Sequence, residues 1–248
     1  MTSTMETGHS KNVANFDELI SSALGFGTDY DPTKESLKIL SMQATSALAK
    51  KAIAGVNDTL PLYSNAIAER EAAFLPLSKL ATRLLNALKA TDTSKQVIDN
   101  ALTIIRKLQG RRATPKKTEA EKKELATQGV EIKEISSSQM SYNNRLENFD
   151  KLIKLLLSVP LYNPNEADLK TTSLTALLNG LRTKNSAVLA ANTPLNNARL
   201  LRNNVLYNNV TGLVDTAMGA KSYIKSVFGA TSPQYRLVAN LEFAKIKI

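Results

Sequence analysis

The sequence contains no cysteine and no tryptophan, and histidine occurs only once in its 248 residues. Without cysteine the chain has no disulfide, no thiolate metal ligand and no cysteine nucleophile. Without tryptophan, and with aromatic residues at only 5%, we do not expect a platform for stacking nucleic-acid bases. These shortages exclude several common classes of enzyme and of nucleic-acid-binding protein.

The single histidine, His9, lies near the start of the chain among small polar residues. Ferritin-like metal sites need two Glu-x-x-His pairs, and only Glu6 and His9 have that spacing. A chain terminus is also a poor place to hold a catalytic base. No glycine-rich phosphate loop occurs either. We therefore expect an exposed His9, no metal, no cofactor, no catalytic residue and no enzymatic activity.

Long apolar runs are absent as well. A membrane-spanning helix needs about 18 or more apolar residues, and the richest stretch, LIKLLLSVPLY, is short and contains lysine and proline. The first residues lack the basic and apolar segments of an export signal. We expect a soluble cytoplasmic protein.

The net charge is +10, and residues 161–248 contribute ten basic against four acidic side chains. The strongest local cluster lies in GRRATPKKTEAEKKE, residues 110–124, and is interrupted by three glutamates. Basic residues of this kind can bind phosphates without regard to sequence, whereas mixed-charge runs are more often solvated connectors. The candidate polyanion-binding residues are Arg111, Arg112, Lys116, Lys117, Lys122 and Lys123.

A stretch near the start of the chain recurs in the second half. NFDELI at 15–20 returns as NFDKLI at 148–153, an offset of 133. At an offset of 132, ten of the 45 residues from 30 to 74 are identical in the second copy, including Tyr30 and Pro32, against about three expected by chance. Because the Tyr-x-Pro match falls at a helix break, helical periodicity does not explain it. We predict an internal duplication; the alternative is that two amphipathic helical segments share a composition.

Apolar spacing indicates helix almost throughout the chain. A stripe from Ile67 to Leu88 contains Pro76, where we expect a kink or a new helix. A second stripe predicts one helix of about seven turns over 132–156. Turn residues at 25–33 and 159–167 predict breaks, as do those at 55–61 and 191–196. The tail, 235–248, is expected to be packed or extended.

These segments predict an all-α, up-and-down bundle of about six to seven helices, built as a duplicated three-helix unit. The expected organisation is a first helical repeat unit over 1–109, a basic polar linker over 110–124 and a second unit over 125–248. The apolar stripes need cover, so the two units are expected to share one core.

The segment AKSYIKSVFGATSPQYRLVANLEF, residues 220–243, resembles the C-terminal tail of uncharacterised all-helical proteins of Bacteroidetes. The resemblance covers about a tenth of the chain. It implies a helical fold and carries no known activity with it.

Three functions are compatible with this pattern. The leading hypothesis is a non-enzymatic structural or protein-interaction module that binds an unidentified protein or associates with itself through uncovered apolar stripe. The second is polyanion binding through the linker and the basic second half. The third is a membrane-active bundle. Asp17 and Asp150, which are equivalent in the duplication, also form a possible acid–base pair, although a solvated residue at the edge of a packed helix is the simpler interpretation.

Overall fold

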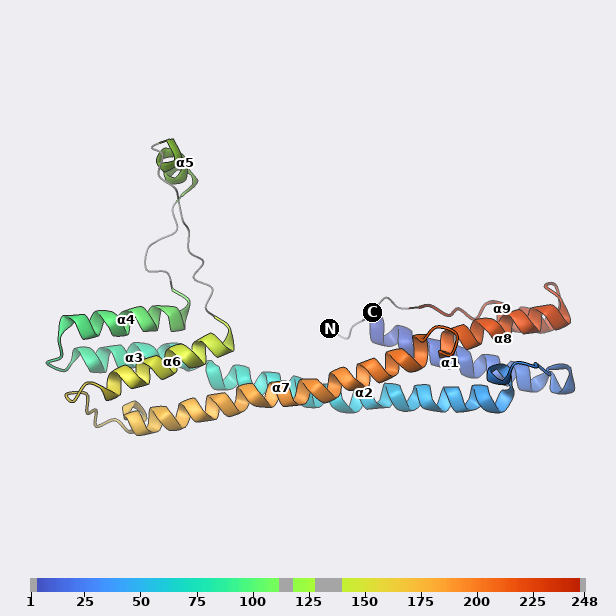
Figure 1. Ribbon diagram of the computed structural model, residues 1–248, viewed down its shortest axis with the longest axis horizontal. Coiled ribbons are helices and arrows are strands. Elements are labelled where there is room, and N and C mark those ends of the chain that lie inside the picture. The colour runs from blue at the N-terminus through green and yellow to red at the C-terminus, as the bar shows by residue number, and fades with distance from the viewer. Residues whose placement is uncertain (1–3, 112–117, 128–139, 246–248) are drawn as a thin grey trace. The chain divides into compact units, whose positions relative to one another are not determined.

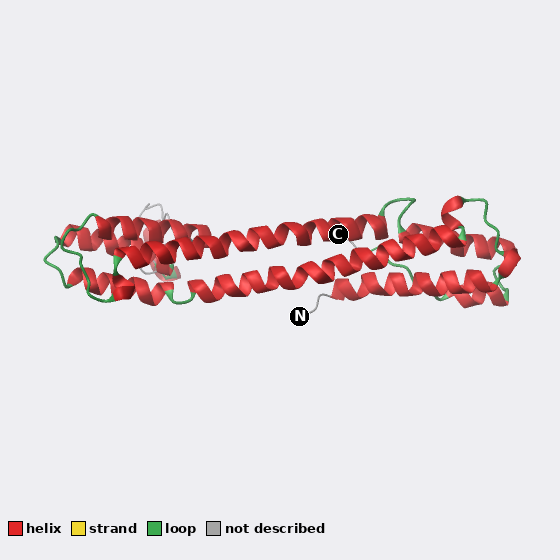
Figure 2. Cartoon of the chain, turned by 90° about the horizontal axis from the view of Figure 1, so that it is seen from below, coloured by secondary structure: helices red, strands yellow, loops and turns green. Residues whose placement is uncertain are grey.

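The computed structural model describes residues 4–111, 118–127 and 140–245 (Figure 1). Within these ranges the chain is helical and contains no strand, so the predicted all-α class is confirmed (Figure 2). Seven of the described helices have 13 or more residues, and α5 and α9 are shorter. The elements are α1 (Thr4–Gly25), η1 (Gly27–Asp29), η2 (Glu35–Leu37), α2 (Ile39–Phe74), α3 (Leu77–Lys89), α4 (Lys95–Gln109), α5 (Glu119–Thr127), α6 (Tyr142–Leu157), η3 (Ala167–Leu169), α7 (Thr171–Tyr207), α8 (Leu213–Phe228) and α9 (Pro233–Ala239), where η marks a short 3₁₀ helix.

The chain divides into two compact units that do not follow the predicted boundaries at 109 and 125. The first unit combines Met1–Ser64 with Ala190–Ile248, and the second unit is Asn65–Leu189. Helices α2 and α7 each contribute one part to each unit. Every unit therefore contains helices from both halves of the sequence, whereas we predicted that each half forms a unit of its own.

The core of the first unit forms where α1 packs against α8 and α9. The inward side of α1 carries Phe16 and Leu19, which are completely buried. Burying such a side chain contributes about 1.5–3 kcal/mol. The residues that α8 and the end of α7 add to this core are Leu206, Tyr207, Leu213, Val214, Ala217, Ala220 and Ile224.

The core of the second unit forms where α4 packs against α3 and α6. The predicted stripe of α3 is buried here, and the predicted interruption at Pro76 is confirmed, because α2 ends at Phe74 and α3 begins at Leu77. From α6 the core takes Phe149, Leu152 and Leu156. The start of α7 adds Leu174, Leu178 and Leu181. The buried residues thus group into a cluster within each unit.

The predicted seven-turn helix over 132–156 is wrong at its start. Helix α6 begins at Tyr142, and the side chain of Ser141 accepts a hydrogen bond from the backbone N–H of Asn144 at 3.2 Å. A serine N-cap of this kind satisfies a backbone donor that the first turn leaves free. Residues 132–139, including Gln139, lie outside the described residues.

The predicted breaks at 55–61 and 191–196 are also wrong, because α2 continues through Pro61 and α7 continues through Pro194. Proline removes one helical hydrogen bond and frees the carbonyl four residues earlier. Both prolines lie on exposed sides of their helices. Water can therefore reach the freed carbonyls, and Val56 and Leu195, which are buried close by, hold the helices in place.

The predicted polar linker, 110–124, is partly helical. Helix α4 ends at Gly110, whose φ of 68° is the left-handed conformation that glycine adopts readily. Helix α5 then starts at Glu119, inside the predicted linker.

The Tyr-x-Pro segments form closely similar loops. Tyr30 Oη donates to the carbonyl oxygen of Leu37 at 2.8 Å, and Tyr162 Oη donates to that of Leu169 at 3.0 Å. Each loop leads through a 3₁₀ turn into one of the two longest helices. These loops support the predicted duplication, which stays a prediction.

Alkaline pH is expected to weaken the fold through these two tyrosines. Burial raises the pKa of Tyr30 and of Tyr162 to about 12, whereas an unperturbed tyrosine titrates near 10. Because the folded chain holds both phenolic protons more tightly, the stabilisation is complete below about pH 10 and is lost as the pH rises to about 12. We expect the urea midpoint to fall across this range.

A chain carrying Tyr30→Phe and Tyr162→Phe cannot ionise at these positions. It is expected to start less stable, by about 1 kcal/mol for each lost hydrogen bond, and to lose less stability between about pH 10 and 12. Urea unfolding at several pH values measures both slopes. Equal slopes in the two chains would contradict the assignment.

Candidate functional site

The six basic residues predicted to bind a polyanion are only partly described. Arg111 is exposed, and its backbone N–H donates to the carbonyl oxygen of Arg106 at 2.8 Å at the end of α4. Lys123 is exposed on α5. Arg112, Lys116 and Lys117 lie outside the described residues, as does the side chain of Lys122. Polyanion binding therefore stays a prediction.

The aspartates considered as an acid–base pair lie in different units, and each pairs with basic side chains of its own unit. Asp17 accepts a hydrogen bond of 2.5 Å from Ser46 Oγ and lies 2.8 Å from Lys50 Nζ. Asp150 lies 2.6 Å from Lys154 Nζ and 3.5 Å from Arg182. This geometry assigns both carboxylates to helix packing: Asp17 links α1 to α2, and Asp150 links α6 to α7.

The spacing of these pairs also fits the predicted duplication. Lys50 and Arg182 are separated by the same 132 residues as the two tyrosines, and Asp17 and Asp150 by 133. Ion pairs at exposed positions contribute only about 0–1 kcal/mol to stability. Their main effect is therefore to fix the register of α1 on α2 and of α6 on α7.

His9 is buried, contrary to the expectation of an exposed terminal residue. It is 3% exposed, and its Nδ1 lies 2.6 Å from Tyr207 Oη. The prediction was wrong because α1 starts at Thr4 and packs against the end of α7, so His9 is part of a formed helix. Among the described residues, no group of three or more histidines, aspartates and glutamates could hold a metal ion.

The tail after α9 is held by side chains that sequence patterns did not single out. Asn12 donates to the carbonyl oxygen of Ala244 at 2.9 Å and accepts from its N–H at 3.1 Å. Asn15 donates to Glu242 O at 2.7 Å, and Lys221 Nζ donates to Leu241 O at 2.7 Å. Residues 235–239 of the expected packed or extended tail are instead part of helix α9. Residues 241–244 after it are packed, and these side chains anchor them.

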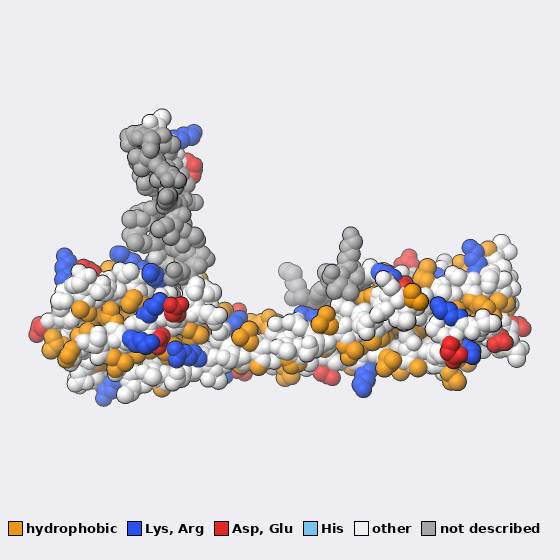
Figure 3. All heavy atoms as spheres, viewed as in Figure 1, with side chains coloured by type: hydrophobic (Ala, Val, Ile, Leu, Met, Phe, Trp, Pro, Cys, Tyr) orange, Lys and Arg blue, Asp and Glu red, His pale blue; other side chains and the backbone are white. Residues whose placement is uncertain are grey.

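The strongest candidate for an interaction surface lies on α2 in the first unit. Leu40 is 80% exposed and Leu48 is 58% exposed, although both are large apolar residues. Ala44 and Ala47 lie between them on the same side of the helix, at spacings of three and four residues, and are exposed too. We call Leu40, Ala44, Ala47 and Leu48 the α2 face. Figure 3 shows hydrophobic side chains reaching the surface along this part of the chain.

A groove borders the α2 face on the side of α1. It has a volume of about 390 Å³, and its apolar wall includes Leu24, which is itself exposed, and Ala47 of the α2 face. The ion pair between Asp17 and Lys50 lies in the same groove. The groove and the α2 face together form a continuous, mainly apolar surface.

The sequence predicted that part of an apolar helix face would stay exposed, but it did not predict which helix carries that face. Each described α-helix carries leucine. Whether Leu40 and Leu48 face the core or solvent depends on how α1 packs on α2. A helical pattern alone does not fix that packing.

No protein family, no curated protein and no solved structure matches this chain. The resemblance of residues 220–243 therefore stays a prediction. In the part of the chain that the structure describes, no helix has the length and apolar character needed to cross a membrane.

Proposed function

We propose that the protein is a non-enzymatic helical module that associates with a second copy of itself through the α2 face. The observation that carries this proposal is the exposure of Leu40 and Leu48 on one side of a helix whose opposite side is buried. Exposed apolar area of this kind favours association, at roughly 25 cal/mol for each Å² that becomes buried.

The order of residues on the α2 face suits a second copy. Leu40, Ala44 and Leu48 alternate large and small at intervals of four residues. If two α2 helices pack antiparallel with a shift of four residues, Leu48 of each copy faces Ala44 of the other, and Leu40 lies at the edge of the contact. Alternating large and small side chains pack closely in this way, and the arrangement is the same for both copies, as a twofold interface requires.

The charges beside the α2 face do not oppose such contact. Lys38 lies 2.6 Å from Glu35, and Lys50 lies 2.8 Å from Asp17. Because these two lysines are paired with carboxylates, they add little repulsion between two copies. Lys51, four residues after Ala47, is exposed and forms no ion pair within the described residues, so its long side chain has to turn toward solvent at such a contact. Paired charges at the edge of an interface mainly set its orientation.

Replacing the two leucines is expected to prevent association. In Leu40→Gln/Leu48→Gln, glutamine keeps the helix propensity of α2 but removes four apolar side chains from a twofold interface. We expect the dissociation constant to rise more than about a hundredfold, the equivalent of about 2.7 kcal/mol. Sedimentation velocity over a range of protein concentrations measures this change.

The matched control is Leu75→Gln/Leu157→Gln, which replaces leucines that are 81% and 61% exposed in the second unit. This chain is expected to associate like the unchanged protein. If the protein is monomeric at all concentrations, or if both double variants weaken association equally, the proposal is wrong.

A further inference from the structure

The second unit contains a depression of about 690 Å³ that the function proposed above does not use. One wall is the last two turns of α3 and the residues after them, from Arg83 to Asp92. The other wall is the loop 161–166, together with Leu169. Its volume falls within the range of about 300–1,000 Å³ that is typical of small-molecule sites.

The loop that forms one wall is held in a defined conformation. Tyr162 Oη donates to Leu169 O, and the backbone N–H of Tyr162 donates to Val159 O at 3.0 Å. Arg83 and Asp168 form a bidentate salt bridge that links the loop to α3. In it, Arg83 Nη2 donates to Asp168 Oδ1 at 3.2 Å. A rigid wall lowers the entropy that binding a ligand costs.

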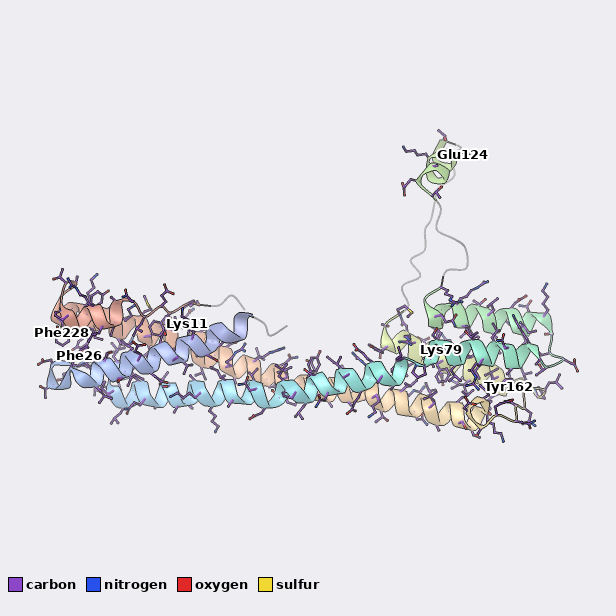
Figure 4. The ribbon with its side chains drawn as sticks, turned by 180° about the vertical axis from the view of Figure 1, so that it is seen from behind. Lys11, Phe26, Lys79, Glu124, Tyr162 and Phe228 are labelled. Atoms are coloured by element: carbon purple, nitrogen blue, oxygen red, sulfur yellow. The ribbon has the colours of Figure 1, made fainter. Side chains whose placement is uncertain are left out.

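Beside the similar loop of the first unit, aromatic rings pack against one another. Tyr30, the equivalent of Tyr162, meets the edge of Tyr223 with ring centroids 5.3 Å apart. Phe26 and Phe228 lie 5.1 Å apart where α1 and α8 end (Figure 4). Aromatic side chains thus pack near the loop of the first unit, whereas the residues that line the depression of the second unit are mostly polar.

Amide groups line the open depression instead. No described residue makes a hydrogen bond to the side chains of Asn86, Asn163 or Asn165, which all contribute to the lining. Each amide offers two donors and an acceptor. The carboxylates of Asp92 and Glu166 add acceptors, and no described basic group forms an ion pair with either.

The charges of this lining select against anions. The single basic residue in the lining is Arg83, and Asp168 already holds its guanidinium. A phosphate or carboxylate would have to displace Asp168 and approach two further carboxylates. A neutral ligand that both donates and accepts hydrogen bonds meets no such cost.

We propose that the depression between the end of α3 and the loop 161–166 binds a neutral carbohydrate, through the side-chain amides of Asn86, Asn163 and Asn165. Sugar hydroxyls donate and accept at once, so each can pair with an amide or a carboxylate of the lining. Leu161, which is 57% exposed at the same depression, offers an apolar contact for the C–H face of a sugar ring.

Saturation-transfer-difference NMR on the full chain tests the site. The probes are glucose, galactose, mannose, N-acetylglucosamine and their common disaccharides, each at about 10 mM, which suffices to detect millimolar affinity. At least one probe is expected to receive saturation from the protein. In Asn163→Ala/Asn165→Ala the dissociation constant for that probe is expected to rise at least about tenfold.

Two controls separate the site from nonspecific effects. Asn100→Ala/Asn179→Ala removes two exposed asparagines elsewhere in the second unit and is expected to bind the probe unchanged. Circular dichroism and thermal melts check that both double variants fold. Spermidine, a polycation, is tested in parallel because Asp92 and Glu166 would attract it.

The proposal is overturned if no sugar receives saturation, if the loop variant binds as well as the unchanged protein, or if spermidine binds and no sugar does. Because the depression lies in the second unit and the α2 face lies in the first, sugar binding and self-association are measured by separate variants. Failure of one does not imply failure of the other.

Discussion

Phe149→Ala is expected to destabilise the second unit by about 3–5 kcal/mol. The side chain of Phe149 is completely buried between α6 and its neighbours, in the same cluster as Leu152 and Leu156. Its removal forfeits the transfer free energy of the ring and leaves a cavity that a packed core closes only in part. Since the total stability of a folded domain is about 5–15 kcal/mol, this one change removes a large share of it.

Urea unfolding followed by circular dichroism measures the effect. With a slope of about 2 kcal/mol per molar urea, the midpoint is expected to fall by roughly 2 M. Leu157→Ala is the matched control, because Leu157 lies on the same helix and is 61% exposed. It is expected to stay within about 0.5 kcal/mol of the unchanged chain.

Phe16 gives a second comparison in the first unit. It is also completely buried, and it is the residue that matches Phe149 where the NFD stretch recurs. Phe16→Ala is therefore expected to cost a similar amount in its own unit. A Phe149→Ala chain that loses less than about 1 kcal/mol would show that α6 does not pack as described.

Local patterns predicted the helices where several signals agreed. The break at Pro76 and the loops at 25–33 and 159–167 combine proline or glycine with a change in apolar spacing, and all three are present in the fold. Elements are easiest to predict where propensity, pattern and turn residues indicate the same structure.

Predictions failed where tertiary contacts outweigh a local signal. Pro61 and Pro194 were expected to end helices, but each lies on the exposed side of a helix with a buried residue close by. His9 was expected to be exposed, but α1 carries it against Tyr207, 198 residues further along the chain. The residues around His9 in the sequence do not indicate a contact with a residue so far along the chain.

The sequence did not predict which helices belong to which unit. Similar sequence in the two halves suggested that each half would form its own unit. Instead the first unit takes α1 from the first half and α8 from the second half. If the halves are duplicated, as predicted, they carry similar apolar faces, so packing within a half and packing between halves satisfy the same pattern and the sequence alone does not distinguish them.

The candidate sites, like the two units, depend on tertiary packing that the sequence does not show. Composition and motifs argued against familiar catalytic centres, but they gave no position for an interaction surface. The α2 face depends on the exposure of Leu40 and Leu48, and the depression depends on the packing of Asn86 of α3 beside the loop that carries Asn163. Neither is encoded in a local sequence pattern.

The most direct test of the central claim, that two copies meet at the α2 face, is the rate of cross-linking from single cysteines. Because the chain has no cysteine, one introduced thiol is the only reactive site for a short bis-maleimide. Ala44→Cys places it at the centre of the α2 face, and Ala72→Cys places it at an exposed alanine elsewhere on α2. If the faces meet, the Ala44→Cys chain forms covalent dimers at least about tenfold faster than the Ala72→Cys chain, because contact raises the effective concentration of the second thiol. Equal rates in the two chains would contradict the account.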